Sequence, residues 1–167
     1  MKITIIGCPG SGKSTLTKKM QEILKCDVLH LDKIYHIDNQ HHITREELKS
    51  KVNEFALTHE NWIIDGNYIS TVGQRINLAD TIILLDIDTQ VCINNAINRS
   101  KKERQDDMAE GFDNSQLKPE FLEFIHKFKN ESLPIINNEL SKAKGKQVIR
   151  LSSYEQIDNY LQSLKNN

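Results

Sequence analysis

The sequence lacks an excess of charge of either sign. Its 22 lysine and arginine residues are balanced by 23 aspartate and glutamate residues, which leaves a formal net charge of -1. Such a chain has no general attraction to nucleic acid or to an anionic membrane, because both require a basic surface. No apolar run approaches the roughly 18 residues that a membrane-spanning helix needs. We therefore expect neither direct nucleic-acid binding nor a membrane anchor.

Cysteine is scarce as well. Cys8, Cys26 and Cys92 are widely spaced and form no C-x-x-C pair, and the chain starts with an apolar strand instead of a targeting segment. These features predict reduced thiols and a cytoplasmic protein. The length of 167 residues suits one domain over 1–167, because neither an internal repeat nor a linker interrupts it. We expect a monomer or a homodimer.

Glycine is sparse, but three of the seven glycines lie in one short stretch, GCPGSGKS over 7–14. This stretch matches G-x-x-x-x-G-K-[ST] at every fixed position. A predicted buried strand (2–6) precedes it and a predicted amphipathic helix (14–25) follows, which is the setting of a phosphate-binding loop. The residues expected to bind the phosphates of ATP are Gly7, Cys8, Pro9, Gly10, Ser11, Gly12, Lys13, Ser14 and Thr15. Within this set, Lys13 is expected to reach the β- and γ-phosphates, and the Ser14 hydroxyl to ligate Mg²⁺.

Apolar and amphipathic stretches alternate along the rest of the chain. Further strands are predicted at 27–31, 62–65, 81–87 and 147–151, and helices at 44–59, 89–102, 119–129 and after 153. Thr44 with Glu47, and Ser153 with Gln156, have the spacing of capping boxes. Five strands separated by helices predict an α/β fold, a parallel sheet with helices on both faces.

One highly charged stretch, about 100–116, interrupts this alternation. It has few residues that could enter a core. A solvated loop and a short lid over the phosphate site are both compatible with it, and its position after the fourth strand and its helix favours the lid.

Carboxylates at strand ends are candidates for holding Mg²⁺ or an acceptor. Asp65 ends the third predicted strand and precedes Gly66, whereas Asp86 lies near the end of the fourth, and spacing alone leaves both open as the metal-side carboxylate. Asp32 closes the second strand, where it could accept a proton from an acceptor hydroxyl. The histidines nearby, His30, His36, His41 and His42, have no metal-ligand spacing, so a polar loop is favoured over a metal site.

Arginine is rare, with Arg45, Arg75, Arg99, Arg104 and Arg150 as the full set. Arginines stabilise the charge that spreads over a phosphoryl group during transfer. Arg99 and Arg104 flank the start of the charged stretch and are expected to reach the triphosphate. Arg75, ten residues past Asp65, could reach an anionic acceptor. The alternative for each of the three is a surface arginine.

Five blocks of the sequence resemble a known family: GCPGSGKSTL at 7–16, HLDKIYH at 30–36, NWIIDGNY at 61–68, INLADTIILLDID at 76–88 and DDMAEG at 106–111. They are similar to the DNA topology modulation (FlaR-related) family of adenylate-kinase-like small P-loop kinases. The resemblance implies a P-loop NTPase fold with a five-stranded parallel sheet in the order 2-3-1-4-5 and a lid after the fourth strand. It also implies that Asp65 and Gly66 match the Asp-Gly of nucleotide kinases, in which the aspartate holds Mg²⁺ through water.

The chain departs from adenylate kinases on the acceptor side. Asn67, Tyr68 and Ile69 stand where those kinases have Phe-Pro-Arg, and no arginine occurs between Ser14 and Thr44. Asp32 at the end of the second strand is instead similar to the shikimate-kinase arrangement. The resemblance thus implies a nucleoside or another small alcohol, not AMP, as the acceptor.

Two functions follow from these residues. One is an ATP-dependent phosphotransferase that moves the γ-phosphoryl of Mg·ATP to a small-molecule acceptor. It would use Lys13, Asp32, Arg99 and Arg104 in catalysis, Ser14 and Asp65 for the metal, and Asp32, Asp65, Gly66 and Arg75 for the substrate. The other is a nucleotide-binding regulatory protein, an ATPase switch without a small-molecule acceptor, as the family's name suggests. The chain has no N-K-x-D motif of the kind that GTPase switches use.

Overall fold

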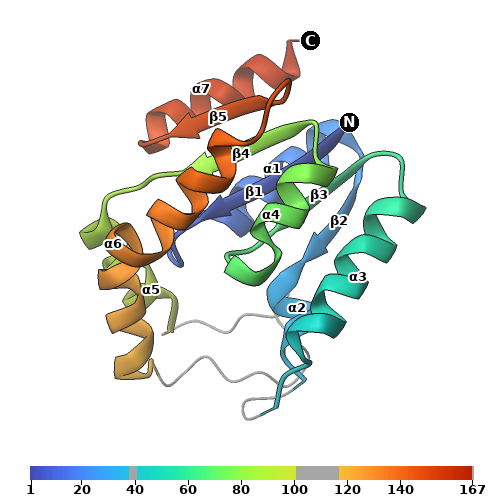
Figure 1. The fold of residues 1–167 in the computed structure, drawn as a ribbon. Helices are drawn as coiled ribbons and strands as arrows, with labels where there is room; N and C mark the ends of the chain where they lie inside the picture. The colour runs from blue at the N-terminus through green and yellow to red at the C-terminus, as the bar shows by residue number, and fades with distance from the viewer. Residues whose placement is uncertain (38–40, 101–116, 167) are drawn as a thin grey trace.

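The computed structural model describes residues 1–37, 41–100 and 117–166 of the chain. Five strands form one sheet: β1 (Lys2–Gly7), β2 (Asp27–His30), β3 (Trp62–Asp65), β4 (Thr81–Leu85) and β5 (Gln147–Leu151). Every pairing is parallel and the order is β2-β3-β1-β4-β5. Figure 1 shows the strands running in one direction, so that their carboxyl ends share one edge. The predicted order 2-3-1-4-5 is confirmed.

The central strands are apolar along their whole length because helices cover both faces of the sheet. Ile3, Ile5 and Ile6 of β1 are buried, and so are all four residues of β3. The sheet edge at β5 is different, since Gln147, Val148 and Arg150 there are exposed. The core is therefore centred on β1, β3 and β4.

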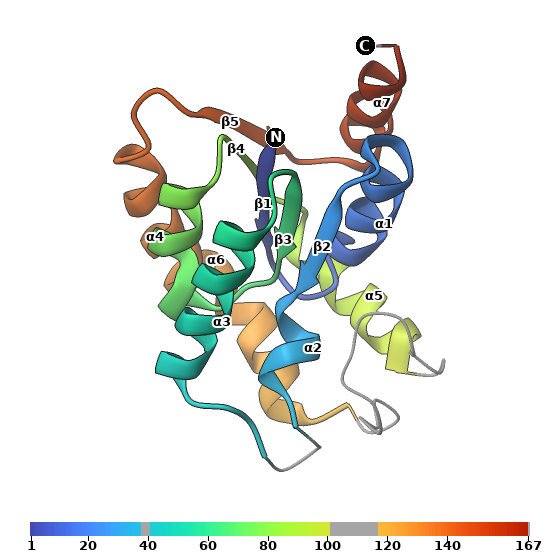
Figure 2. The ribbon, with the colours of Figure 1, turned by 90° about the vertical axis from the view of Figure 1, so that its right-hand side faces the viewer.

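Two layers of helices enclose the sheet (Figure 2). α1 (Lys13–Leu24) and α7 (Tyr154–Lys165) cover one face, and α3 (Arg45–Thr58), α4 (Ile69–Leu78) and α6 (Pro119–Ser141) cover the other. The short α2 (Leu31–Tyr35) and α5 (Thr89–Ser100) lie toward the carboxyl ends of the strands. The capping box at the start of α3 is present, with Thr44 and Glu47 bonding each other's backbone N–H.

Some element boundaries differ from the sequence prediction. The helices α2 and α4 were not predicted, and α6 continues to Ser141 although Pro134 lies inside it. α4 buries Thr71 and Arg75 together with Val72 and Ile76, so its inward face has no clear apolar period. In α6, packing of Ile125, Phe128 and Ile136 outweighs the hydrogen bond that Pro134 cannot donate.

Other expectations concern residues that lie outside the described part. Ser100 ends α5, but residues 101–116, including Arg104, are not described, so the predicted lid stays a prediction. Among the helices of the described ranges, none is both long enough and apolar enough to cross a bilayer.

Candidate active site

The phosphate-binding loop connects β1 to α1. Gly12 is the residue before α1, and no side chain caps this helix end. The N–H groups of the first turn, together with the positive end of the helix dipole, are therefore available to an anion. Gly10 has φ 83°, and a Cβ at this position would lie 2.2 Å from the carbonyl oxygen of Cys92 in α5. Only glycine fits the loop where it passes this close to α5.

Lys13 is held over the loop. Its Nζ donates hydrogen bonds to the carbonyl oxygens of Gly7, at 2.9 Å, and Cys8, at 3.0 Å. Burial lowers the pKa of Lys13, and the negative charges of Asp32 and Asp65 act in the opposite direction. Asp65 ends β3, but Asp32 lies in the first turn of α2 and does not close β2 as predicted, because the strand already ends at His30. Both carboxylates lie close enough for their charges to act on the ammonium group of Lys13.

The loop is also supported from α5 and α7. The amide nitrogen of Asn95 donates to the carbonyl oxygen of Gly10 at 2.9 Å and to the hydroxyl of Tyr154 at 2.7 Å. Neither residue was identified from the sequence. An asparagine in an amphipathic helix and a tyrosine at a helix start carry no signal of this contact.

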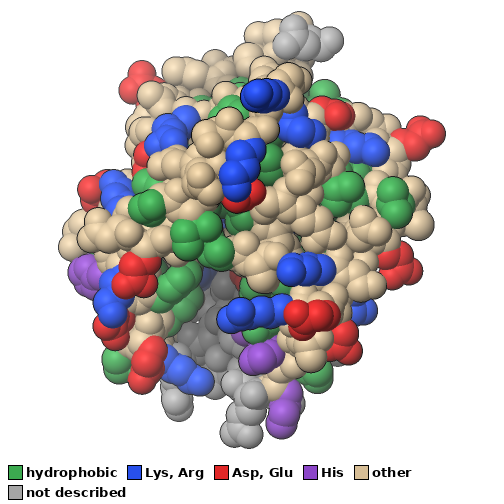
Figure 3. Space-filling model, in the orientation of Figure 1, with side chains coloured by type: hydrophobic (Ala, Val, Ile, Leu, Met, Phe, Trp, Pro, Cys, Tyr) green, Lys and Arg blue, Asp and Glu red, His purple; other side chains and the backbone are tan. Residues whose placement is uncertain are grey.

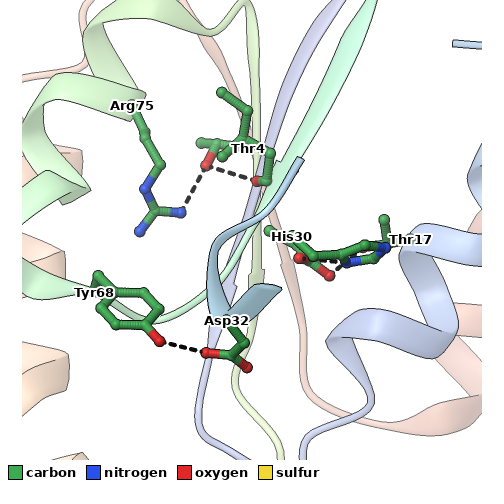
Figure 4. Close-up of polar contacts among 8 residues, drawn as sticks. Thr4, Thr17, His30, Asp32, Tyr68 and Arg75 are labelled. Atoms are coloured by element: carbon green, nitrogen blue, oxygen red, sulfur yellow. Dashed lines mark hydrogen bonds and ion pairs between the residues drawn. The ribbon is translucent and has the colours of Figure 1, made fainter. Parts of the chain in front are cut away.

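Asp65 lies next to the first turns of α1. One carboxylate oxygen accepts a hydrogen bond from the hydroxyl of Thr17 at 2.9 Å, and the other lies 2.9 Å from Nδ1 of His30 (Figure 4). The side chain is almost fully buried, with 4% of the residue exposed. Both carboxylate oxygens have hydrogen-bond partners, an arrangement compatible with the predicted role of Asp65, which is to hold Mg²⁺ through water. His30 was considered as a metal ligand in the sequence, but the structure pairs it with Asp65.

Gly66 lets the chain turn tightly after Asp65. Its φ is 143°, and a Cβ would lie 2.8 Å from Cβ of Leu31 at the start of α2. The close contact brings the segment after β3 against the segment after β2. These two segments carry Asp32, which was predicted to meet an acceptor hydroxyl, and Tyr68.

Asp86 and Asp88 have other partners. Asp86 forms an ion pair with Arg150 at 3.0 Å, and Asp88 accepts hydrogen bonds from the backbone N–H groups of Gln90 and Val91 at the start of α5. Both carboxylates therefore stabilise the chain around β5 and α5. Of the two metal-side candidates, Asp65 has the geometry that fits the role.

On the acceptor side, Asp32 pairs with Tyr68. The tyrosine hydroxyl donates to one oxygen of Asp32 at 2.7 Å and lies 3.4 Å from Nε2 of His36. Burial and the charge of Asp32 raise the pKa of Tyr68, so that the phenol stays a hydrogen-bond donor. The ring of Tyr68 lies 4.7 Å from that of Tyr35, which stacks on His42. Among the described residues, no group of three His, Cys, Asp or Glu could hold a metal ion.

Arg75 is fully buried, so the surface alternative is wrong for this residue. Its Nε donates to the hydroxyl of Thr71 and its Nη1 to the hydroxyl of Thr4, each at 3.1 Å. Arg99 lies in the last turn of α5, and its charge is near enough to contribute to the lowered pKa of Lys13, after burial. Arg104 lies outside the described residues.

The surface is hollowed in the lower part of the molecule, between α6 and α3 in the orientation of Figure 1. Figure 3 shows lysine and arginine side chains on the rim of this hollow. It lies toward the edge of the sheet at which the strands end, the edge where open parallel sheets bind their ligands.

Replacing Gly10 by alanine tests the fit of the loop against α5. We expect Gly10→Ala to lower the free energy of unfolding by about 3–5 kcal/mol and to remove ATP binding, because the new Cβ meets backbone atoms of Cys92. The control is Gly145→Ala, where φ is 74° but nothing lies within 4 Å of the new Cβ. The control is expected to lose about 1–2 kcal/mol, the cost of holding a residue other than glycine in the left-handed conformation. If chemical denaturation showed that both variants lose the same free energy of unfolding, the close contact between Gly10 and Cys92 would be contradicted.

No family model matches the chain, and no curated protein does. The resemblance to the FlaR-related family therefore stays a prediction. Solved structures do match over the whole chain. Deoxyadenosine kinase from M. mycoides with bound dATP has a TM-score of 0.58 and 16% identity, covering 100% of both chains. Shikimate kinase from Bacteroides thetaiotaomicron has a TM-score of 0.58 and 18% identity, covering 99% of this chain and 97% of its own. The chain has the fold of the small P-loop kinases.

Proposed function

We propose that the protein is an ATP-dependent phosphotransferase that moves the γ-phosphoryl of Mg·ATP to a small-molecule acceptor. The observation that carries this proposal is the position of Lys13, over the phosphate loop and within the influence of both Asp32 and Asp65. A loop that only stored a nucleotide would not need a carboxylate on the acceptor side. The fold shared with a nucleoside kinase and with shikimate kinase supports the same reading.

The triphosphate binds the loop and the start of α1 in this proposal. Lys13 contacts the β- and γ-phosphates, and Arg99 and Arg104 neutralise the charge that develops on the transferred group. Ser14 and Asp65 hold Mg²⁺, Asp65 through water. When bound, Mg²⁺ supplies positive charge to the phosphate oxygens. The hydrogen bonds from Thr17 and His30 fix the orientation of the Asp65 carboxylate.

Asp32 acts on the acceptor. Tyr68 occupies one of its oxygens, which fixes the carboxylate and leaves the second oxygen for the acceptor hydroxyl. The hydroxyl oxygen forms a bond to the γ-phosphorus, the bond from that phosphorus to the β–γ bridging oxygen breaks, and the hydroxyl proton passes to Asp32. The products are ADP, the phosphorylated acceptor and one proton.

Asp65→Asn is expected to lower turnover by about 100-fold and to leave affinity for metal-free ATP nearly unchanged, because its role is to hold the cation. Asp86→Asn is the matched control at the next strand end, and it should keep its turnover and lose only the exposed pair with Arg150. Steady-state kinetics as a function of Mg²⁺ concentration checks both. If Asp86→Asn were the damaging change and Asp65→Asn silent, the assignment would be reversed.

A screen of small alcohols and nucleosides tests the proposed function. ADP formation is measured with Mg·ATP and each candidate acceptor, against a sample without acceptor. We expect at least one acceptor to raise ADP formation well above hydrolysis. ADP formation that no acceptor changes would support the alternative, an ATPase switch that regulates another process.

A further inference from the structure

Arg75 carries a buried charge that no side chain neutralises directly. Of the arginines that the structure describes, it is the only buried one, with 0% of the residue exposed. No ion pair in the described part of the chain involves it. Arg150, by contrast, pairs with Asp86. A buried guanidinium is costly unless an anion pairs with it, so the lack of one here calls for an explanation.

The hydrogen bonds to the two threonines do not satisfy all of the donor groups of the guanidinium. Nε and Nη1 donate to Thr71 and Thr4, but Nη2 is buried without a hydrogen-bond partner. Burial lowers the pKa of Arg75 to about 10, although the charge of Asp65 acts in the opposite direction, and the group stays charged near neutral pH. Arg75 therefore offers a positive charge and at least one free donor group inside the protein.

The guanidinium lies on the acceptor side of the sheet. Arg75 extends from α4, and Tyr68, which pairs with Asp32, is the residue that precedes this helix. Figure 4 shows Arg75 and Tyr68 on the same side of the strands, with Thr17 and His30 on the other. A group bound to Arg75 would thus belong to the acceptor and not to the triphosphate.

A second unpartnered polar side chain lies in the connection between β3 and α4, just before the helix that carries Arg75. Asn67 follows Gly66, and both its amide nitrogen and its amide oxygen are buried without partners. Buried polar groups usually have hydrogen-bond partners, so orphaned groups on Asn67, in this connection, and on Arg75, in the helix that follows, point to a missing polar ligand. The Asn67 amide can donate one hydrogen bond and accept another.

We propose that the acceptor is an alcohol that also carries a carboxylate or phosphate group, and that Arg75 and Asn67 bind this anionic group while Asp32 receives the hydroxyl. This inference rests on the proposed phosphotransferase function. Nη2 is closed off from solvent, so the anion reaches it only when the side chains that cover it move apart. A neutral nucleoside would add no counter-ion to the charge of Asp65, which acts on the guanidinium without forming an ion pair with it.

Matched acceptor pairs test the inference. Each pair consists of an anionic alcohol and its neutral counterpart: glycerol 3-phosphate and glycerol, shikimate and methyl shikimate, deoxyadenosine 3′-monophosphate and deoxyadenosine. The phosphate-bearing acceptors and the carboxylate-bearing shikimate are compared with each other, which tells whether the site prefers a phosphate or a carboxylate group. We expect an anionic member to be preferred in kcat/KM by about 10²–10³-fold, the effect of a buried charge pair.

Arg75→Met is expected to remove this preference and leave ATP affinity unchanged, because methionine fills similar space without the charge. The control is Thr71→Val, which keeps the guanidinium and removes one of its contacts, and which should keep the preference. Asn67→Ala gives a second readout if Arg75→Met does not fold. It should raise KM for the anionic acceptor about tenfold with little change in kcat.

Three outcomes decide the matter. If Arg75→Met folds and still prefers the anionic acceptor, the proposed role of Arg75 is wrong. If Arg75→Met does not fold, Asn67→Ala decides, and an unchanged KM for the anionic acceptor contradicts the proposed site. Equal use of neutral and anionic alcohols overturns the acceptor class while the phosphotransferase function stands. Absence of transfer to every acceptor, with ATP hydrolysis alone, overturns the proposed function itself and this inference with it.

Discussion

Replacing Lys13 by alanine is expected to reduce affinity for Mg·ATP by about 100-fold or more, because the variant loses the ammonium group that bonds the phosphate loop. The fold should remain intact. Lys13 contributes no apolar packing to the core, and burial already disfavours its charged form, as its lowered pKa shows. Isothermal titration calorimetry measures the affinity, and thermal unfolding measures the stability.

Lys19→Ala is the matched control for this prediction. Lys19 lies on the same helix, α1, but its side chain is half exposed and faces Asp158 at 3.7 Å. The control should bind Mg·ATP as the wild type does. Unchanged affinity in Lys13→Ala, or an equal loss in both variants, would remove the basis for assigning the phosphate loop.

Asp32→Asn is expected to lower acceptor-dependent turnover by about 10²–10⁴-fold and to spare ATP binding. Asparagine can still accept the hydrogen bond from Tyr68, so the local structure is kept, but its amide cannot receive the proton of the acceptor hydroxyl. Asp27→Asn is the control, since Asp27 begins β2, the strand that precedes Asp32, and is exposed. Steady-state kinetics with the acceptor found in the screen checks the prediction, and normal turnover in Asp32→Asn would contradict the role of Asp32 as the base.

Much of the fold could be predicted because its signals are local. The strands 62–65 and 147–151 have the predicted bounds, and the Thr44–Glu47 capping box starts a helix where the sequence placed one. The helix α4 could not be predicted in this way. Its inward face includes Arg75 and Thr71. Arg75 donates to the hydroxyl of Thr71 and to that of Thr4, which lies on a strand distant in sequence.

The candidate site shows the same division. The phosphate loop is a contiguous pattern, so its residues can be found in the sequence. The partners of Asp65 cannot, because His30 reaches it through the register of β2 with β3, and Thr17 through the packing of α1 on the sheet. Tyr68 likewise reaches Asp32 across 36 positions of sequence. Contacts of this kind exist only after the sheet has formed.

The fate of a labelled γ-phosphoryl tests the central claim most directly. The wild-type protein and Asp32→Asn are incubated with Mg·ATP labelled with ³²P at the γ-position and with the preferred acceptor. The products are then separated into inorganic phosphate and phosphorylated acceptor. The proposed function predicts that the wild type delivers most of the label to the acceptor, in equal amount to the ADP formed, and that Asp32→Asn loses this transfer. Label found only in inorganic phosphate, with or without acceptor, would contradict it.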